Sequence, residues 1–450
     1  MRKSPISWLI ASAFLAPSFI LSAQAEDLMH VYKQALAYDA TYASARSSLT
    51  ASKERVPQAK SQLLPNIAIN ANQTNAQTRF SPGNEGQIGL SPTGGLAVIT
   101  GQNTTDHTTA YSLVLSQPLF RWDRWQTFEQ SKLAAAIGEA QFAQAGQDLI
   151  LRVAQAYFDL LAAQDVIESI LAQKKATTEQ LASAKLQYKV GTQIITDTYD
   201  AQAAYDLVVS QEISAQNDLE NKRTALQAMI GNSPASVATL PSSVRLSAPQ
   251  PAQIESWVSS AENQNYNVIS AQFALESAQR EIKKSRSGHL PTLDLVSSVS
   301  NTSTQNTIRS KSIGINLTIP LYSGDGTSSR IRENLALEEK AKNDVDFTRR
   351  AAVQTARQAF LGVNSGIAQV AALEAAEISG QSSFDSNKLG YEVGVRINLD
   401  VLNAQRLLFS TRANLAKARY DTIMNGLRLK AAAGTLKEAD LVQVNSLLRN

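Results

Sequence analysis

Residues that commonly perform catalysis or bind metals are scarce in this sequence. There is no cysteine, and the three histidines, His30, His107 and His289, are far apart along the chain. A thiol nucleophile and a cysteine-rich metal site are therefore excluded, and a histidine-centred site is not favoured. We find no spacing that brings acids, bases or nucleophiles together beyond chance. The sequence therefore predicts a protein that is not an enzyme and that needs no cofactor or metal.

Acidic residues do recur in one motif. The segments DTYDAQ and DVLNAQ begin at Asp197 and Asp400. Thr196 or Asp197 can cap a helix that begins in the first segment, and Asn398 or Asp400 can do so in the second. A carboxylate can also form a strong, charge-assisted hydrogen bond with a phenol or a guanidinium. From these residues alone, capping is the favoured interpretation.

These motifs belong to an internal duplication. The two motifs are 203 residues apart (400 − 197), and so are two glycines that precede them (394 − 191). Paired prolines in each copy are 53 residues apart in the first copy and 29 in the second, so the first copy holds 24 extra residues. The matching segments are Leu63-Leu64-Pro65-Asn66-Ile67 with His289-Leu290-Pro291-Thr292-Leu293, Gln117-Pro118-Leu119-Phe120 with Ile319-Pro320-Leu321-Tyr322, and Tyr188-Lys189-Val190-Gly191 with Tyr391-Glu392-Val393-Gly394.

The N-terminus has the features of a secretory signal peptide. A basic start is followed by an apolar stretch over residues 6–21 and by the small-x-small pattern AQA at residues 23–25. We therefore expect residues 1–25 to be removed and the mature chain to begin at Glu26. Nothing later approaches 18 uninterrupted apolar residues, so a membrane would have to be crossed by strands.

The charge balance argues against nucleic acid as a partner. The whole chain has a formal charge of +3, and the charge falls to +1 without the two basic residues of the leader. No basic run is present. In an exported chain, the absence of cysteine also excludes a disulfide framework.

Each copy is predicted to contain a helix, a β-hairpin, a long helix, a turn and a further helix. The first repeat spans 26–231, with a hairpin at about 65–118, a long exposed loop at 81–106 and coiled helices at about 123–231. A linker follows at 232–250. The second repeat spans 251–434, with a hairpin at about 291–320 and coiled helices at about 326–433, and a C-terminal tail occupies 435–450.

The hairpins are predicted from a period of two. Residues 313, 315, 317 and 319 are Ile, Ile, Leu and Ile, and they alternate with Ser, Gly, Asn and Thr. The same alternation occurs at 67–72 and 111–115. Such segments are typical of transmembrane barrel strands, although half-buried strands of a soluble sandwich would alternate in the same way.

The helical segments carry a heptad seam, in which apolar residues are separated by steps of four and three. Between Trp125 and Val190 there is no proline. At 1.5 Å per residue this helix would be about 100 Å long, so it must pack beside others along a rod or tube. A coiled-coil dimer would explain the helices but not the strands. The seam consists of Leu149, Val153, Ala156, Leu160, Ala163, Ile167 and Ile170, and, with smaller side chains, of Ala352, Ala356, Ala359, Val363, Gly366, Val370 and Leu373.

Four strands in one chain cannot close a barrel. Bacterial barrels have at least about 8 strands, and an open edge in lipid leaves unpaired backbone groups that cost several kcal/mol each. Several chains must therefore share one barrel of about 8, 12 or 16 strands. Physical reasoning alone leaves this number open.

Across essentially the whole mature chain, the sequence resembles the TolC family of outer-membrane channel-tunnel proteins. The resemblance rests on GHLPTLDL at 288–295, YEVGVR at 391–396 and DVLNAQ at 400–405, and residues 441–450 resemble the family's C-terminal end. It implies a mainly α fold with a β-barrel contribution. Three chains would form a 12-stranded barrel in the outer membrane of a Gram-negative bacterium, continued by an α-helical barrel through the periplasm.

The implied function is an exit duct for drugs or polypeptides in tripartite efflux or type I secretion systems. The implied partners are two further copies of the chain, outer-membrane lipid, a periplasmic adaptor (membrane fusion) protein and an inner-membrane pump of the RND, ABC or MFS type. The alternative is a non-transporting trimeric coiled-coil scaffold or adhesin. Adhesins usually place one barrel unit at a chain end, whereas hairpins here occur in both copies.

The resemblance also implies a periplasmic gate. Matching motif to motif, Tyr391 and Arg396 are expected to bond to Asp197, with Thr196 and Gln180 nearby. With the resemblance, the same residues are expected both to cap their helices and to close the gate.

A constriction and a docking site are implied beside this gate. Asp400 is expected to point to the axis, so that a trimer carries a ring of three carboxylates that favours cations. The family has a second acid one turn further on, where this chain has Asn403, which implies a weaker cation trap.

The adaptor is expected to dock at the helix tips, although from the residues alone each glycine there is a helix C-cap with positive φ. The tip residues are Val190, Gly191, Thr192, Val393, Gly394 and Val395.

Overall fold

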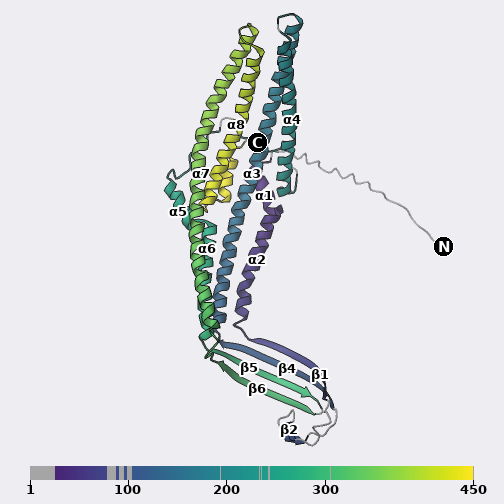
Figure 1. Ribbon diagram of the computed structural model, residues 1–450, viewed down its shortest axis with the longest axis vertical. Coiled ribbons are helices and arrows are strands. Elements are labelled where there is room, and N and C mark those ends of the chain that lie inside the picture. Colours follow the sequence, from purple (N-terminus) through teal and green to yellow (C-terminus); the bar gives the residue numbers. More distant parts are fainter. Residues whose placement is uncertain are drawn as a thin grey trace, which may run out of the picture.

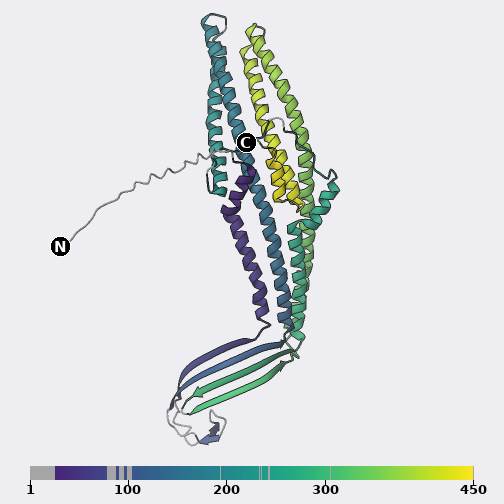
Figure 2. The same cartoon turned by 180° about the vertical axis from the view of Figure 1, so that it is seen from behind.

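The computed structural model describes residues 26–448 apart from 79–87, 91–95, 99–103, 193, 233, 235, 242–243 and 305. The predicted leader therefore lies outside the described residues, as does most of the predicted loop at 81–106. The described part is a long helical rod with a four-stranded sheet at one end (Figure 1). From behind, the same sheet is seen to run obliquely to the rod (Figure 2).

Two successive runs of similar elements make up the chain. The first run contains α1 (Leu28–Tyr38), α2 (Ala40–Ser61), β1 (Asn66–Thr78), β4 (Thr104–Phe120), α3 (Trp122–Lys189) and α4 (Ile195–Ile230). The second run contains α5 (Ile254–Gln264), α6 (Tyr266–Arg286), the short 3-10 helix η1 (Ser287–His289), β5 (Thr292–Ser303), β6 (Thr307–Thr318), α7 (Gly326–Glu392) and α8 (Asn398–Ala432), and α9 (Glu438–Asn445) follows. The prediction of a mainly helical fold with a smaller antiparallel strand component is confirmed.

The segment between β1 and β4 contains structure that the sequence did not predict. Ile88–Leu90 (β2) and Leu96–Val98 (β3) form an antiparallel pair inside the expected loop. Three-residue apolar runs are too short to show a period of two, which is why the pattern missed them.

The four long strands form one antiparallel sheet in the order β1-β4-β5-β6. Its central pair, β4 and β5, joins the two repeats. The edge strands, β1 and β6, come from different repeats. Each edge presents a row of backbone groups that can pair with another strand.

The two faces of this sheet differ in polarity. The register aligns Ile69 with Leu113, and Leu113 with Val299, so these side chains share one face. Most of the exposed large apolar side chains of the strands lie on this face, and the opposite face carries mainly small polar side chains. The apolar face includes Ile67, Ile69, Leu113, Val299, Ile313, Ile315 and Leu317, and the polar face includes Asn70, Ser112, Ser298, Ser300, Ser310 and Ser312.

The predicted long helix is present. α3 has 68 residues, which corresponds to about 100 Å. Its seam residues Leu149, Val153 and Leu160 are buried. The small side chains of the α7 seam allow this helix to lie close to α8. The approach is so close that a Cβ added at Gly366 would collide with the side chain of Thr422.

The middle of the rod holds the main core. Buried side chains from α1, α3, α4, α8 and α9 meet there, including Leu28, Tyr157, Leu226, Met424 and Leu441. Helices from both ends of the chain therefore close the same core, which places the two termini of the described chain near each other (Figure 1).

Each repeat builds the same corner at this level. Gly231 follows α4 and Gly434 follows α8, 203 residues apart, and both have positive φ, 83° and 73°. Gly231 lies against Tyr38, and Gly434 lies against Asn265 and the residue before it. Asn265 also caps α6, and its Nδ2 donates to the carbonyl of Ala432 at 2.9 Å.

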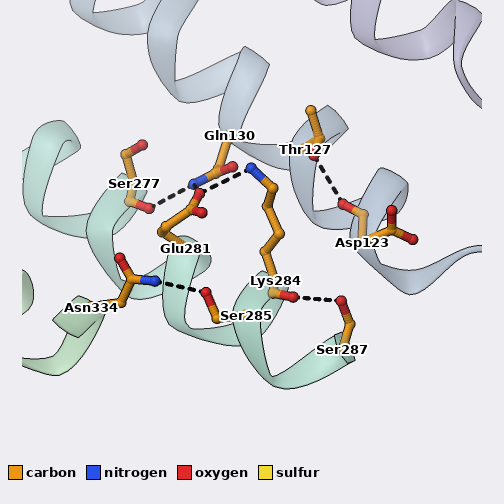
Figure 3. A network of polar contacts seen from close by, with 9 residues as sticks. All are labelled: Asp123, Thr127, Gln130, Ser277, Glu281, Lys284, Ser285, Ser287 and Asn334. Carbon is orange, nitrogen blue, oxygen red and sulfur yellow. Dashed lines mark hydrogen bonds and ion pairs between the residues drawn. The ribbon is translucent and has the colours of Figure 1, made fainter. Parts of the chain in front are cut away.

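Polar contacts tie the helices together where the rod meets the sheet (Figure 3). Gln130 of α3 donates from Nε2 to Oε2 of Glu281 in α6, at 2.8 Å. Asn334 of α7 donates to Oγ of Ser285 in α6, at 2.7 Å. Residues that are partly or fully buried therefore fix α3, α6 and α7 relative to one another just before the strands begin.

An ion pair fixes the two repeats at the base of the sheet. Arg121, between β4 and α3, donates from Nε and Nη2 to the two carboxylate oxygens of Asp294 in β5, at 3.0 and 2.6 Å. Such a two-pronged, charge-assisted contact sets both the distance and the angle between its partners. It therefore stabilises the register at which β4 meets β5.

One helix of the rod is apolar over part of its length. Among the described helices, α7 alone is long and apolar enough to cross a membrane by composition, with a window of mean hydropathy 1.2. Polar residues interrupt α7 throughout, so it contains no run of 18 uninterrupted apolar residues. Several apolar residues of α7, including Ala356, Val363 and Val370, are buried against other helices of the rod, which gives them a packing role.

Candidate functional site: the helix tips

The turns after α3 and α7 lie at the same end of the rod, away from the sheet (Figure 1). Gly191 and Gly394 have φ of 79° and 80°, so the prediction of glycine C-caps with positive φ is confirmed. Both turns present exposed apolar side chains, because Val190, Val393 and Val395 are each at least 64% exposed.

The following helices begin without side-chain caps. The N-cap residues of α4 and α8 are Ile194 and Ile397, and neither end has a side-chain hydrogen bond. The interpretation of Thr196, Asp197, Asn398 or Asp400 as caps is therefore wrong. α4 begins at Ile195 and α8 begins at Asn398 itself, so every expected capping residue lies inside its helix. Asp197 and Asp400 instead lie in the first turn, where a carboxylate is favoured by the helix dipole.

Buried polar side chains join the two helical hairpins just behind these turns. Nearest the tip, the Tyr391 hydroxyl donates to Oε1 of Gln187 at 2.6 Å. Next, Gln180 donates from Nε2 to Oδ1 of Asn398 at 2.5 Å, and Nδ2 of Asn398 donates to the Asp197 carbonyl at 3.0 Å.

A third contact lies further from the tip. Gln405 donates from Nε2 to Oγ1 of Thr177 at 2.8 Å and to the carbonyl of Gln173 at 3.1 Å. We call the side chains of Gln187, Tyr391, Gln180, Asn398, Thr177 and Gln405 the polar ladder. All its links run between α3 or α4 in the first repeat and α7 or α8 in the second.

The polar ladder is largely removed from water. Asn398 is fully buried, and Gln405, Thr177 and Tyr391 are at most 3% exposed. Buried polar groups without partners are costly, so each link stabilises the contact between the hairpins only while both partners remain in place.

The predicted bonds to the Asp197 carboxylate are not formed between the described residues of this chain. Tyr391 donates to Gln187, and Arg396 lies 3.7 Å from the Asp400 carboxylate, with both side chains more than a third exposed. Gln187 gives the buried phenol a neutral acceptor, so no carboxylate has to be desolvated. Thr196 is exposed and is not part of the ladder.

Burial shifts the pKa of two side chains at the tip. Burial raises the pKa of the Asp197 carboxyl above its usual value, and the nearby charge of Asp200 adds to this. Burial likewise raises the pKa of the Tyr391 phenol, and the Asp197 charge adds to it. Tyr391 and Asp197 are therefore close enough to influence each other without sharing a hydrogen bond.

The predicted constriction residues lie on one side of α8. Asp400 is in the first turn and is half-buried, and Asn403 follows three residues later and is exposed. Oδ1 of Asn403 accepts from Nη2 of Arg406 at 3.0 Å.

Sequence reasoning missed Gln187, Thr177 and Gln405 as members of the site. A signal was present, because Gln187 and Gln180 are seven residues apart in α3, and Gln405 and Asn398 are seven apart in α8. Polar residues at the heptad spacing of a helix seam indicate a buried polar seam. Among the described residues, no three His, Cys, Asp or Glu side chains gather as a metal site requires.

Comparison with known proteins accounts for both repeats. A family model described as outer membrane efflux protein matches residues 31–232 and 257–435. The first matched range ends just after α4, and the second begins in α5 and ends just after α8. The duplication seen in the structure is therefore a property of that family's pattern.

Two relatives show the extent of the similarity. The chain is 32% identical to the outer membrane protein TolC of Salmonella enteritidis over 443 residues, which cover 96% of this chain and 86% of the relative. It is also 32% identical to the alkaline protease secretion protein AprF of Pseudomonas aeruginosa, over 73% of this chain and 70% of the relative.

A solved structure has the same fold. The chain resembles the CmeC outer membrane channel of Campylobacter jejuni with a TM-score of 0.78 at 16% sequence identity. The match covers 99% of this chain and 97% of that chain, so the likeness includes both the rod and the sheet.

Proposed function

The chain belongs to the outer membrane efflux protein family, and on this premise we propose that three copies form one duct for drugs or polypeptides across the outer membrane. The observation that carries the proposal is the match of both repeats, together with 32% identity to TolC over 96% of the chain. The chain is accordingly an outer-membrane exit channel of the kind that serves efflux and secretion.

The open sheet supports a trimer. Its edges, β1 and β6, each lack a partner strand among the described residues, and lipid does not tolerate unpaired backbone. Three sheets joined edge to edge give 12 strands, a closed barrel of a common size. The apolar face carrying Ile69 and Ile315 would then meet lipid, and the face carrying Asn70 and Ser298 would line the lumen.

The rod supports a tube below this barrel. α3 and α7 each extend for about 100 Å, which suits a passage through the periplasm rather than a compact domain. Each chain has two similar helical hairpins, so a trimer would have six. The tube would then have about twice the rotational symmetry of the oligomer.

Partners follow from the premise of a passive duct. No nucleotide or ion-coupling site is needed in the duct itself, and energy would come from an inner-membrane pump of the RND, ABC or MFS type through a periplasmic adaptor. The relatives include both a protease secretion protein and an efflux protein, the latter being BepC of Brucella suis. We therefore assign both efflux and type I secretion to the range of this duct.

Single-channel recording tests the proposal. Purified protein added to a planar bilayer should give discrete conductance steps, and the conducting species should have the mass of three chains. A purified chain that remains a folded, water-soluble monomer and carries no current would exclude the duct.

The gate is proposed at the helix tips. The polar ladder, which includes Gln180 and Tyr391, would hold the second hairpin against the first in the closed state. Thr196, Asp197 and Arg396 would lie beside it, with Thr196 and Arg396 exposed where a neighbouring chain approaches. Opening would then exchange neutral hydrogen bonds, which leaves no buried charge unpaired.

Replacing Asp400 with alanine is expected to weaken the block of the channel by divalent or trivalent cations. In a trimer, three Asp400 carboxylates would surround the narrowest point, and such rings bind cations. The measurement is the cation concentration that halves the conductance, which should rise strongly in the variant. Unchanged block would remove Asp400 from the constriction, and Asn403→Asp should strengthen the block if the assignment is correct.

Replacing Gly394 with a bulky residue such as tryptophan is expected to abolish efflux while the trimer still forms. The turn is open, with no atom within 4 Å of a Cβ at Gly394, so the bulk of tryptophan affects a docking surface more than the packing. The positive φ of 80° costs any residue other than glycine about 1–3 kcal/mol, so Gly394→Ala is the control for that strain. Drug susceptibility of cells reports efflux, and gel filtration reports the trimer. Normal efflux in this variant would count against adaptor docking at Val393 and Val395, and at the matching Val190, Gly191 and Thr192.

A further inference from the structure

We propose that Arg309 and Lys311 form a binding site for lipid headgroups that carry a phosphate and a net negative charge, on the outward face of the sheet. The proposal rests on the outer-membrane barrel described above and adds a specific lipid contact to it.

The register places both cations on the apolar face. Lys311 lies opposite Val299, which itself lies opposite Leu113. Arg309 lies opposite Asn301, two residues further along the same strand. Alternate residues of a strand point to the same side about 7 Å apart, so the two side chains form one pair on the lipid side.

Their position along β6 places the pair at a membrane boundary. The apolar residues Ile313, Ile315 and Leu317 follow on the side of the helices, whereas Arg309 and Lys311 lie toward the turn that joins β5 to β6. That turn is at the end of the sheet away from the rod (Figure 1). With the rod in the periplasm, the pair would reach the outer leaflet, where a lipid-facing cation costs little.

The charged side chains that the described strands place on this face are all cationic. The two carboxylates of the described strands, Asp106 and Asp294, lie on the opposite face of the sheet. Neither Arg309 nor Lys311 forms an ion pair with a carboxylate of the described residues. An anionic ligand is therefore favoured, and a guanidinium beside an ammonium suits phosphate oxygens.

Hydrogen-bond donors extend the site across the chain boundary. In the trimer, β6 would pair with β1 of a neighbouring chain. The outward residues toward the far end of β1 include Asn75 and Gln77, which carry carboxamides, and applying the β4–β5 register to the matching residues of β6 and β1 places Gln77 opposite Lys311. An exposed surface of cations and amides, above an apolar band, matches a phosphorylated headgroup with its acyl chains below.

Native mass spectrometry of the full trimer tests this site. The trimer is incubated in mixed micelles with equal amounts of phosphatidylglycerol and phosphatidylcholine, and the retained lipids are counted. We expect the wild type to retain phosphatidylglycerol preferentially. The double variant Arg309→Gln/Lys311→Gln should reduce this preference by about 25-fold, from about fivefold per cation.

Matched variants separate charge from shape. Arg309→Lys/Lys311→Arg keeps both charges and should keep the preference, and Lys53→Gln/Arg55→Gln removes two charges from α2 and should leave it unchanged. An excess of inorganic phosphate should not displace the lipid, because the acyl chains also contact the apolar band. Complete displacement would assign the site to free phosphate and overturn the proposal.

Channel recordings distinguish this inference from the proposed function. The double variant should conduct as the wild type does, because the cations do not face the lumen. A double variant that conducts normally and still prefers phosphatidylglycerol would overturn the lipid site and leave the duct intact. A wild-type protein that forms no channel would instead remove the duct on which the site rests.

Discussion

Channels carrying Asn398→Ala are expected to be open far more often than wild-type channels. Asn398 is fully buried and both donates to and accepts from the first hairpin, so alanine leaves Nε2 of Gln180 without its acceptor and removes the side-chain hydrogen bond to the carbonyl of Asp197. Such a loss costs about 1–3 kcal/mol. If it falls on the closed state alone, the ratio of open to closed channels rises about 5- to 150-fold.

Open probability in planar bilayers measures this effect directly. The matched control is Asn414→Ala, which removes the same side chain further along α8, where it is exposed and lies outside both the polar ladder and the constriction. Gln405→Ala should act in the same direction as Asn398→Ala, because it cuts the next link of the polar ladder. Asn398→Ala channels with wild-type open probability, in properly formed trimers, would show that the ladder does not hold the gate.

Gly434→Ala is expected to prevent formation of stable protein. The residue has φ of 73°, and any Cβ there would meet backbone atoms of the α5–α6 junction, including the Asn265 nitrogen at 2.8 Å. The left-handed conformation alone costs a non-glycine residue about 1–3 kcal/mol. The collision adds to this cost, because backbone atoms cannot rotate away as the end of a side chain can.

Gly191→Ala is the control, since Gly191 has φ of 79° but nothing lies within 4 Å of its Cβ. Gly191→Ala should incur only the cost of the left-handed backbone conformation. It should therefore still form a trimer, which melts at a moderately lower temperature. Thermal unfolding followed by circular dichroism distinguishes the two variants. Equal melting temperatures for Gly434→Ala and Gly191→Ala would mean that the corner accommodates a side chain and does not fix the helices.

The sequence predicted the order of elements well because the duplication tests each assignment twice. The alternation at 313–319 and at 67–72 specifies strands in both repeats, and a proline-free run specifies α3. These are local properties of the chain, set by which side chains face lipid, water or other helices. The pairing of β5 with β6 follows once the strands are known, because a short turn joins them as antiparallel neighbours. The pairing of β4 with β5 joins strands from different repeats across the four helices α3 to α6, so no local pattern specifies it.

Side-chain pairing at the tips was predicted less well. The carboxylate of Asp197 is the stronger acceptor in isolation, yet the phenol of Tyr391 bonds to Gln187. Whether Tyr391 bonds to Asp197 or to Gln187 depends on the axial shift and rotation of the helices relative to one another. No sequence motif encodes these. The capping interpretation failed for a similar reason, since the start of α8 at Asn398 is decided by packing of that residue against the first hairpin.

The ion pair between Arg121 and Asp294 would make the two kinds of strand boundary in the proposed trimer unequal. Within one chain it fastens β4 to β5, whereas at a β6–β1 boundary the corresponding positions of the duplicated sequence hold Ser323 and Ala68, which carry no charge. A barrel of three chains would thus alternate fastened boundaries with boundaries held only by backbone pairing and packing. In the proposed trimer, the joints between neighbouring molecules would therefore be held less firmly than the joint between the two repeats of one molecule.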